Sequence, residues 1–267
     1  MAKDILVSLL SDDLFSLNWM SLLIVRDWRT RVFTEGELLN PPEAGRAESI
    51  RYVDVVVADL DSFVLNTSLF FNLNRYLEEN PSILVIGVGS RIEPLFFHRI
   101  PKPNIGGYLI KSEVSSSLGW AVSFAHEGFL VYTPGAQQAA FNHGFSSSKP
   151  VRVVKSRVYP GMTDRQSEIA RLAIIFSVGR RDLADELKIS DQWSYGVVSE
   201  LYEKLGLNEL SQDKDEIIAS LENNPIIKTH IDDILAEMGN SKKAKDLETL
   251  AFHILTLPEF SQKINSD

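Results

Sequence analysis

The sequence predicts an α/β domain followed by an all-α domain. Short apolar runs alternate with segments of helical periodicity through about the first 127 residues, and this alternation is typical of a parallel sheet covered by helices. Beyond residue 160 only helical patterns occur. A chain of 267 residues, 44% hydrophobic and 24% charged, is long enough for two modest cores and has a globular composition.

Five runs rich in β-branched residues are the predicted strands. Most of them do not alternate apolar with polar positions, as expected for strands buried on both faces. Apolar residues at helical spacing lie between them, for example in residues 14–23 and 69–77, and a short fourth helix is expected at 93–98. The predicted strands are residues 5–10, 30–33, 53–58, 83–86 and 108–110.

Turn-forming residues follow this pattern, so the first domain is expected to end at residue 127 and a linker to cover 128–160. The linker is basic, because it contains Lys149, Arg152, Lys155 and Arg157.

Three short helices are predicted next, in residues 161–207. Thr163 precedes Gln166 at capping-box spacing and begins a helix that runs to about Phe176. Helices at 181–187 and 191–205 follow, with Ser190 as the expected N-cap and Gly206 as the terminating residue. Such an arrangement is a helix-turn-helix. Residues 208–267 are predicted to form an acidic helical extension.

Composition excludes several classes of protein. No apolar run approaches the roughly 18 residues of a membrane span, and the first residues lack the pattern of a signal peptide, so we expect a cytoplasmic protein with no membrane partner. The absence of Cys excludes disulfides and thiolate metal sites. A net charge of −9 argues against a surface that binds nucleic acid all round.

Four stretches together resemble the response regulators of two-component signalling, in the subfamily with a LuxR/NarL-type C-terminal module. The resemblance spans most of residues 4–207 and implies a flavodoxin-like (βα)5 receiver domain followed by a LuxR-type helix-turn-helix. The stretches are Val-Asp-Val-Val-Val-Ala-Asp-Leu at 53–60, Gly-Tyr-Leu-Ile-Lys at 107–111, Met-Thr-Asp-Arg-Gln at 162–166 and Leu-Tyr-Glu-Lys-Leu-Gly at 201–206.

The resemblance implies that Asp59 is the phosphoacceptor and that Lys111 pairs with the phosphoryl group. Such chemistry needs Mg²⁺ held by carboxylates. The family's acidic pair falls on Leu10 and Ser11, however, and its reporter hydroxyl falls on Gly87.

Two acids lie one step beyond that pair, which gives Asp12, Asp13 and Asp59 as the candidate metal set if the first strand is longer or bulged. Mg²⁺ is therefore expected only in a phosphorylation-competent receiver, and no other cofactor is expected. We expect Asp59 to pair with Lys111 and not to be phosphorylated.

The helix-turn-helix also departs from the pattern of the family that it resembles. LuxR-type recognition helices usually carry basic residues on their outward face, whereas this helix presents Glu200 and Glu203. Contacts with DNA phosphates are expected from Arg180, Arg181, Lys188 and Lys204. Gln192, Tyr195 and Ser199 are the other candidates on the outward face. Trp193 is a further candidate, which is expected either to contact DNA or a protein partner or to be partly buried.

The sequence favours an atypical response regulator that controls transcription through DNA binding as a homodimer, with a histidine kinase or another signalling protein as a possible partner. The alternative is a signalling adaptor with a pseudo-receiver that binds a protein and has lost sequence-specific DNA binding. An enzyme is not expected, because no nucleophile and base pair can be assembled from the spacing.

Overall fold

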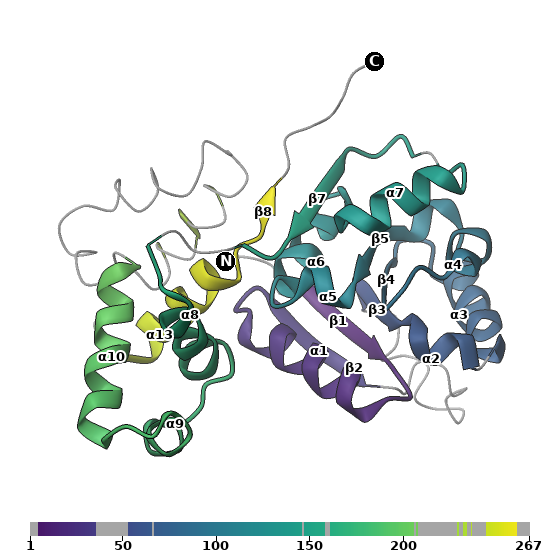
Figure 1. Cartoon of the computed structure of the whole chain (residues 1–267). Coiled ribbons are helices and arrows are strands. Elements are labelled where there is room, and N and C mark those ends of the chain that lie inside the picture. Colours follow the sequence, from purple (N-terminus) through teal and green to yellow (C-terminus); the bar gives the residue numbers. More distant parts are fainter. Residues whose placement is uncertain are drawn as a thin grey trace. The chain divides into compact units, whose positions relative to one another are not determined.

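The computed structural model describes residues 5–35, 53–65, 67–145, 147–157, 161–205, 207, 229, 232–233, 236 and 244–260. The chain divides into two compact units (Figure 1). The sheet unit comprises residues 3–156 and 258–267, and the helical unit comprises residues 157–257. No described helix is both long enough and apolar enough to cross a membrane.

A single sheet of eight strands, in the order β2-β1-β3-β4-β5-β6-β7-β8, forms the centre of the sheet unit. The first seven strands are parallel to their neighbours and β8 is antiparallel to β7. The order of the first five strands is that of flavodoxin-like folds. The strands are β1 (Ile5–Leu10), β2 (Thr30–Glu35), β3 (Val55–Asp59), β4 (Leu84–Gly89), β5 (Ile105–Ile110), β6 (Leu130–Tyr132), β7 (Val151–Lys155) and β8 (Glu259–Phe260).

Described helices follow β1, β3, β4, β5 and β6 in the chain. Side chains of α3, α4 and α7 pack with the sheet in one hydrophobic cluster, which includes Phe70, Phe96, Tyr108 and Ala136. The elements are α1 (Leu14–Arg26), α2 (Leu60–Leu65), α3 (Thr67–Glu79), α4 (Pro94–Arg99), the 3-10 turn η3 (Lys102–Asn104), α5 (Lys111–Val114), α6 (Leu118–His126) and α7 (Pro134–Asn142).

The close approach of α1 and α6 depends on a glycine. A Cβ atom at Gly119 would lie 2.5 Å from a carboxylate oxygen of Asp27. That carboxylate holds the guanidinium of Arg29, which lies 4.1 Å from the ring centre of Trp120. Arg29, Asp27 and Trp120 are all buried, so the ion pair is covered by an aromatic face.

Two of the predicted domain boundaries need correction. The expected linker at 128–160 is wrong for most of its length, because β6, α7 and β7 lie within it and extend the sheet. Ala136 and Ala140 of α7 are buried in the core. The sheet unit therefore continues past residue 127 to Ser156. The predicted receiver-like α/β fold is confirmed, with two further parallel strands beyond β5.

The helical unit contains the predicted helix-turn-helix. Both hydrogen bonds of the Thr163 and Gln166 capping box form, and Ser190 caps the third helix of the helix-turn-helix by accepting from the N–H of Trp193. Gly206 lies outside the described residues, as do most residues of the predicted extension. The elements are α8 (Asp164–Ala170), the π-helical turn η4 (Arg171–Ile175), α9 (Arg180–Leu187), α10 (Asp191–Lys204) and α13 (Ala244–Thr256).

Candidate functional site

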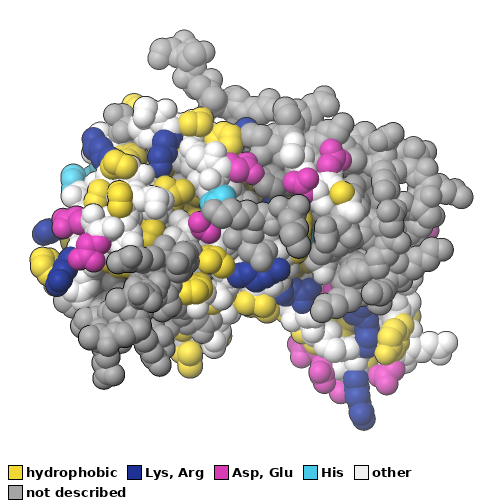
Figure 2. All heavy atoms as spheres, turned by 180° about the vertical axis from the view of Figure 1, so that it is seen from behind, with side chains coloured by type: hydrophobic (Ala, Val, Ile, Leu, Met, Phe, Trp, Pro, Cys, Tyr) yellow, Lys and Arg dark blue, Asp and Glu magenta, His cyan; other side chains and the backbone are white. Residues whose placement is uncertain are grey.

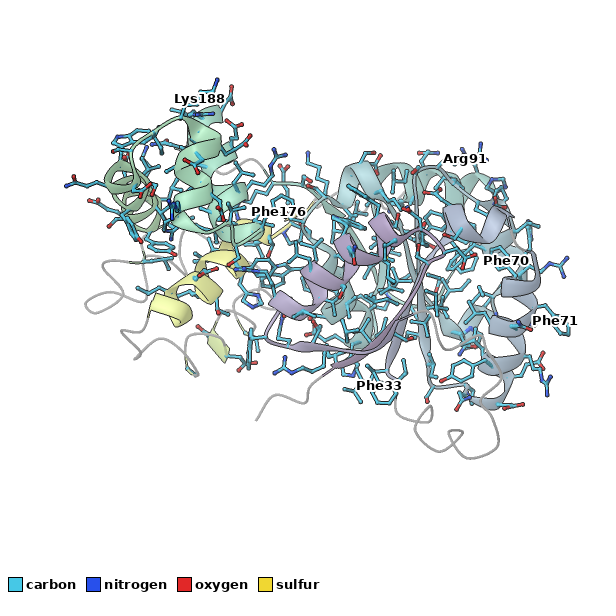
Figure 3. All side chains as sticks on the ribbon, turned by 90° about the horizontal axis from the view of Figure 1, so that it is seen from below. Phe33, Phe70, Phe71, Arg91, Phe176 and Lys188 are labelled. Carbon is cyan, nitrogen blue, oxygen red and sulfur yellow. The ribbon has the colours of Figure 1, made fainter. Side chains whose placement is uncertain are left out.

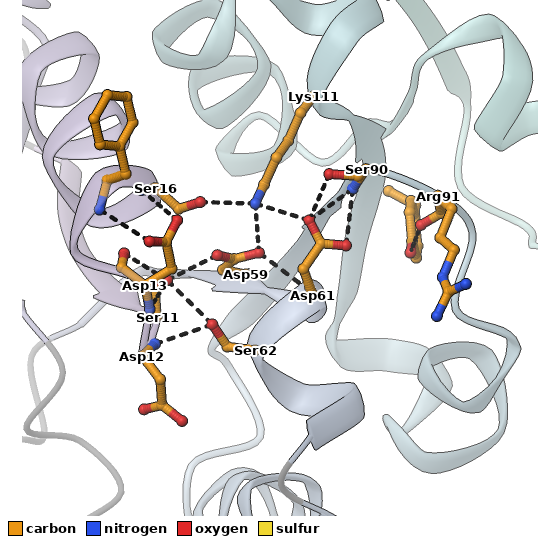
Figure 4. A network of polar contacts seen from close by, with 12 residues as sticks. Ser11, Asp12, Asp13, Ser16, Asp59, Asp61, Ser62, Ser90, Arg91 and Lys111 are labelled. Atoms are coloured by element: carbon orange, nitrogen blue, oxygen red, sulfur yellow. Dashed lines mark hydrogen bonds and ion pairs between the residues drawn. The ribbon is translucent and has the colours of Figure 1, made fainter.

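Asp59 and Lys111 meet at the carboxyl edge of the sheet, as the order of the strands predicts. Asp59 ends β3, and Lys111 directly follows β5. Parallel strands present their carboxyl ends at one edge, where ligand sites of open α/β sheets form. Lys111 Nζ lies 2.8 Å from Oδ1 of Asp59 (Figure 4). The predicted pairing of these two residues is therefore present.

Both carboxylate oxygens of Asp59 have partners within the protein. Oδ1 contacts Lys111 and also accepts from the N–H of Asp61 at 3.2 Å. Oδ2 accepts from the hydroxyl of Ser11 at 2.7 Å. The side chain of Asp59 is completely buried. A buried charge is tolerated when it is paired and hydrogen-bonded in this way.

Asp61 is a member of this network that the sequence did not reveal. Its carboxylate lies 2.9 Å from Lys111 Nζ and accepts from both the N–H and the hydroxyl of Ser90. Desolvation would raise the pKa of Asp61, but the hydrogen bonds from Lys111 and Ser90 outweigh it and hold that pKa below its ordinary value. The only signal was an acid two residues after Asp59.

Lys111 joins three side chains at once. Its Nζ contacts Asp59 and Asp61 and donates to the hydroxyl of Ser16 at 2.8 Å. Desolvation would lower the pKa of Lys111, but the two carboxylates outweigh it and raise that pKa. The ammonium therefore stays charged and bridges β3, α1 and α2.

The predicted metal set of Asp12, Asp13 and Asp59 is not supported. The carboxylate of Asp13 caps α1 by accepting from the N–H groups of Phe15 and Ser16, and hydrogen bonds from Ser16 lower its pKa. The side chain of Asp12 points away from Asp59 (Figure 4). No group of three possible ligands is assembled among the described residues. The described carboxylates therefore do not form the predicted three-carboxylate set for Mg²⁺.

The position of the missing reporter hydroxyl is filled by packing. A Cβ atom at Gly87 would lie 2.6 Å from a methyl group of Leu60 and 3.0 Å from the ring of Phe96. The hydroxyl of Ser90, three residues further along the chain, donates to Asp61. The loop after β4 is also held by Tyr108, whose hydroxyl donates to the carbonyl of Arg91 and accepts from the N–H of Glu93.

The second candidate surface lies on the helix-turn-helix. Trp193 and Tyr195 are 50% and 63% exposed, and Gln192 and Ser199 are exposed beside them. The opposite face of α10 is buried through Val197, Val198 and Leu201. The outward direction predicted for Gln192, Tyr195 and Ser199 therefore agrees with the packing, and Trp193 is exposed as well.

The basic candidates of the helical unit differ from one another. Lys204 donates to the side chain of Gln166 and lies 3.8 Å from Glu200, so it is engaged within the protein. Arg181 and Lys188 are exposed and Arg180 is half-buried, and none of these three forms an ion pair with a described residue. Acidic and basic side chains are interleaved on the visible face of this unit (Figure 2).

Comparisons with known proteins gave matches among solved structures only. No family model and no curated protein matches the chain. The response regulator ChrA of a heme-sensing two-component system is 20% identical, with 78% of this chain and 92% of that chain covered and a TM-score of 0.40. The Salmonella typhimurium response regulator RcsB is 16% identical, with 78% and 99% covered and a TM-score of 0.39. RcsB from Salmonella enterica serovar Typhimurium bound to promoter rprA is 15% identical, with 79% and 100% covered and a TM-score of 0.36.

Proposed function

We propose that this chain is a response-regulator-like protein that controls transcription by binding DNA through its helical unit. Its receiver-like sheet unit does not work as a conventional Asp-phosphorylation switch. The observation that carries the DNA-binding proposal is the set of cations around the helix-turn-helix. Arg180 and Arg181 begin α9 and Lys188 lies in the turn before α10, and the three are available to phosphates.

The recognition surface would work mainly through the DNA backbone. The outward face of α10 holds no Lys or Arg before Lys204, and Lys204 is engaged by Gln166. Gln192 and Ser199 offer hydrogen-bonding groups for base edges, whereas Trp193 and Tyr195 offer apolar contacts. Most of the affinity would then come from phosphate contacts, which carry no sequence information themselves.

A homodimer is the form in which a helix-turn-helix reads two half-sites, and we propose that state here. A histidine kinase or another signalling protein would bind the sheet unit. With both oxygens of Asp59 held by Ser11, Lys111 and Asp61, such a partner would act by contact and not by phosphotransfer.

The salt dependence of binding tests the proposal. Fluorescence anisotropy with mixed genomic fragments should show affinity that falls steeply as salt rises. Replacing Arg181 or Lys188 by Gln should weaken binding to all fragments and lower the slope by about one unit for each lost contact. Arg165→Gln is the matched control, because Arg165 is exposed in the same unit but is paired with Glu168 at 2.6 Å.

An adaptor that has lost DNA binding is the second candidate. The exposed Trp193 and Tyr195 favour it, because aromatic residues are enriched where proteins bind each other. The same titration separates the two functions. No binding at the lowest salt, or equal binding by the Arg181, Lys188 and Arg165 variants, would contradict the DNA-binding proposal and favour the adaptor.

A further inference from the structure

A pocket between α3 and α4 lies outside the network of Asp59 and Lys111. It has a volume of about 270 Å³, which is near the lower end of ligand pockets. It belongs wholly to the sheet unit, so nothing about it depends on the helical unit. Its lining residues are Phe70, Phe71, Asn74, Leu95 and Arg99.

Apolar surface makes up most of this pocket and is unusually open to solvent. Phe71 is 71% exposed and Leu95 is 41% exposed, although both are large apolar side chains. Phe71 projects outward from α3 (Figure 3). Phe70 is buried and provides the floor. An aromatic or aliphatic group that filled the pocket would remove this surface from water, which is favourable.

Two polar groups in the pocket have no partner among the described residues. Oδ1 of Asn74 is buried and accepts no hydrogen bond from them, whereas the amide nitrogen of Asn74 donates to Glu78 at 3.5 Å. Most buried polar atoms in proteins are hydrogen-bonded, so an orphaned acceptor in a pocket points to a missing donor. Arg99 is exposed and forms no ion pair with a described residue. Its guanidinium suits a carboxylate.

We propose that this pocket binds a small organic acid that has an apolar body and an N–H or O–H donor near its carboxylate. The apolar body packs on Phe70, Phe71 and Leu95. The carboxylate pairs with Arg99, and the donor satisfies Oδ1 of Asn74. N-acylated apolar amino acids and hydroxylated aromatic acids belong to this chemical class.

Three related probes test each part of the proposal, with the full chain and amide chemical shifts as the readout. N-acetylphenylalanine carries the carboxylate, the N–H and the ring, and it should bind with a Kd on the order of 1 mM, as expected for a ligand of this size. Its methyl ester lacks the carboxylate and should bind at least about tenfold more weakly. The Arg99→Gln variant should lose the same affinity for N-acetylphenylalanine. 3-Phenylpropanoate lacks the donor.

Asn74→Ala tests the contact between the ligand's donor and Oδ1 separately from the contact between the carboxylate and Arg99. It should weaken binding of N-acetylphenylalanine about fivefold and leave 3-phenylpropanoate unchanged, since only the former donates to Oδ1. Arg75→Gln is the matched control, because Arg75 is exposed on the same helix and does not line the pocket. Equal affinity for the acid and its ester, or no binding by any probe up to about 10 mM, would overturn the proposal. Neither outcome bears on DNA binding.

Discussion

The hydroxyl of Ser11 donates a 2.7 Å hydrogen bond to Oδ2 of Asp59, at the position where the resemblance predicts an acid. The hydroxyl of Ser11 is neutral and donates this hydrogen bond. An ionised carboxylate in its place would be negatively charged and could not donate to Asp59. With Lys111 on the other oxygen, the charge of Asp59 is compensated by protein groups alone.

Asp59 should not accept a phosphoryl group from a small donor. Its carboxylate is buried and both oxygens are occupied, and the described acids do not assemble a Mg²⁺ cage. We expect no phosphoryl mass shift after incubation with acetyl phosphate and Mg²⁺, measured by intact mass spectrometry. Asp59→Asn is the control, and a shift that appears in the natural chain but not in this variant would refute the prediction.

Removing the positive charge of Lys111 should destabilise the sheet unit. Lys111→Met leaves the buried Asp59 without its counter-charge, and breaking such a pair costs about 3 kcal/mol. Denaturant unfolding measures this cost through Trp19, Trp28 and Trp120, which belong to the sheet unit.

Two comparisons identify the cause of that loss. Lys155→Met removes an exposed pair with Glu259 and should change stability by only about 0–1 kcal/mol. The double change Lys111→Met and Asp59→Asn should be less destabilising than Lys111→Met alone, because no charge is left buried. Equal losses for the single and double variants would contradict the electrostatic explanation.

Acid should weaken the sheet unit through Asp61. The pKa of Asp61 is lower in the folded chain than its ordinary 3.8, so its contribution to stability is complete above pH 3.8. That contribution is lost as pH falls through the folded pKa. Asp61→Asn should therefore flatten the pH dependence of the unfolding midpoint below pH 3.8, whereas Asp12→Asn, at an exposed residue, should preserve it. Parallel curves for Asp61→Asn and the natural chain would argue against this role.

Two glycine substitutions should have opposite effects. Gly87→Ser restores a hydroxyl at the reporter position but forces its Cβ against Leu60 and Phe96, which should cost about 1–3 kcal/mol. Gly196 lies inside α10 with open space around its Cβ position, so Gly196→Ala should stabilise the helical unit by about 1 kcal/mol. Thermal unfolding followed by circular dichroism measures both. A Gly87→Ser variant as stable as the natural chain would contradict this prediction, because it would show that Leu60 moves to make room for the new side chain.

The sequence predicted the elements that depend on residues close to one another in the chain. Apolar runs indicated β1 to β5, and the spacing of Thr163 and Gln166 indicated the start of α8. The meeting of Asp59 and Lys111 followed from strand order alone, because each residue lies at the end of a strand. Such features depend on residues that are close in sequence or on a regular topology.

Features that depend on distant partners were missed. β7 contains Arg152 and Lys155 and was interpreted as a basic linker, but Arg152 lies over the ring of Phe129 and Lys155 pairs with Glu259. The bond between Asp61 and Ser90 joins the first turn of α2 to the loop after β4. No spacing pattern encodes these contacts, since each is decided by tertiary packing.

The return of the chain from the helical unit to form β8 has a practical consequence for deletion experiments. Any stop codon placed within residues 157–257 also removes Glu259 and Phe260, and the edge of β7 then loses its antiparallel neighbour. Uncovered strand edges recruit strands from other molecules. Aggregation of a shortened chain would therefore report on the sheet and not on DNA. An internal excision that rejoins residue 156 to residue 258 keeps the sheet intact and isolates the contribution of the helices.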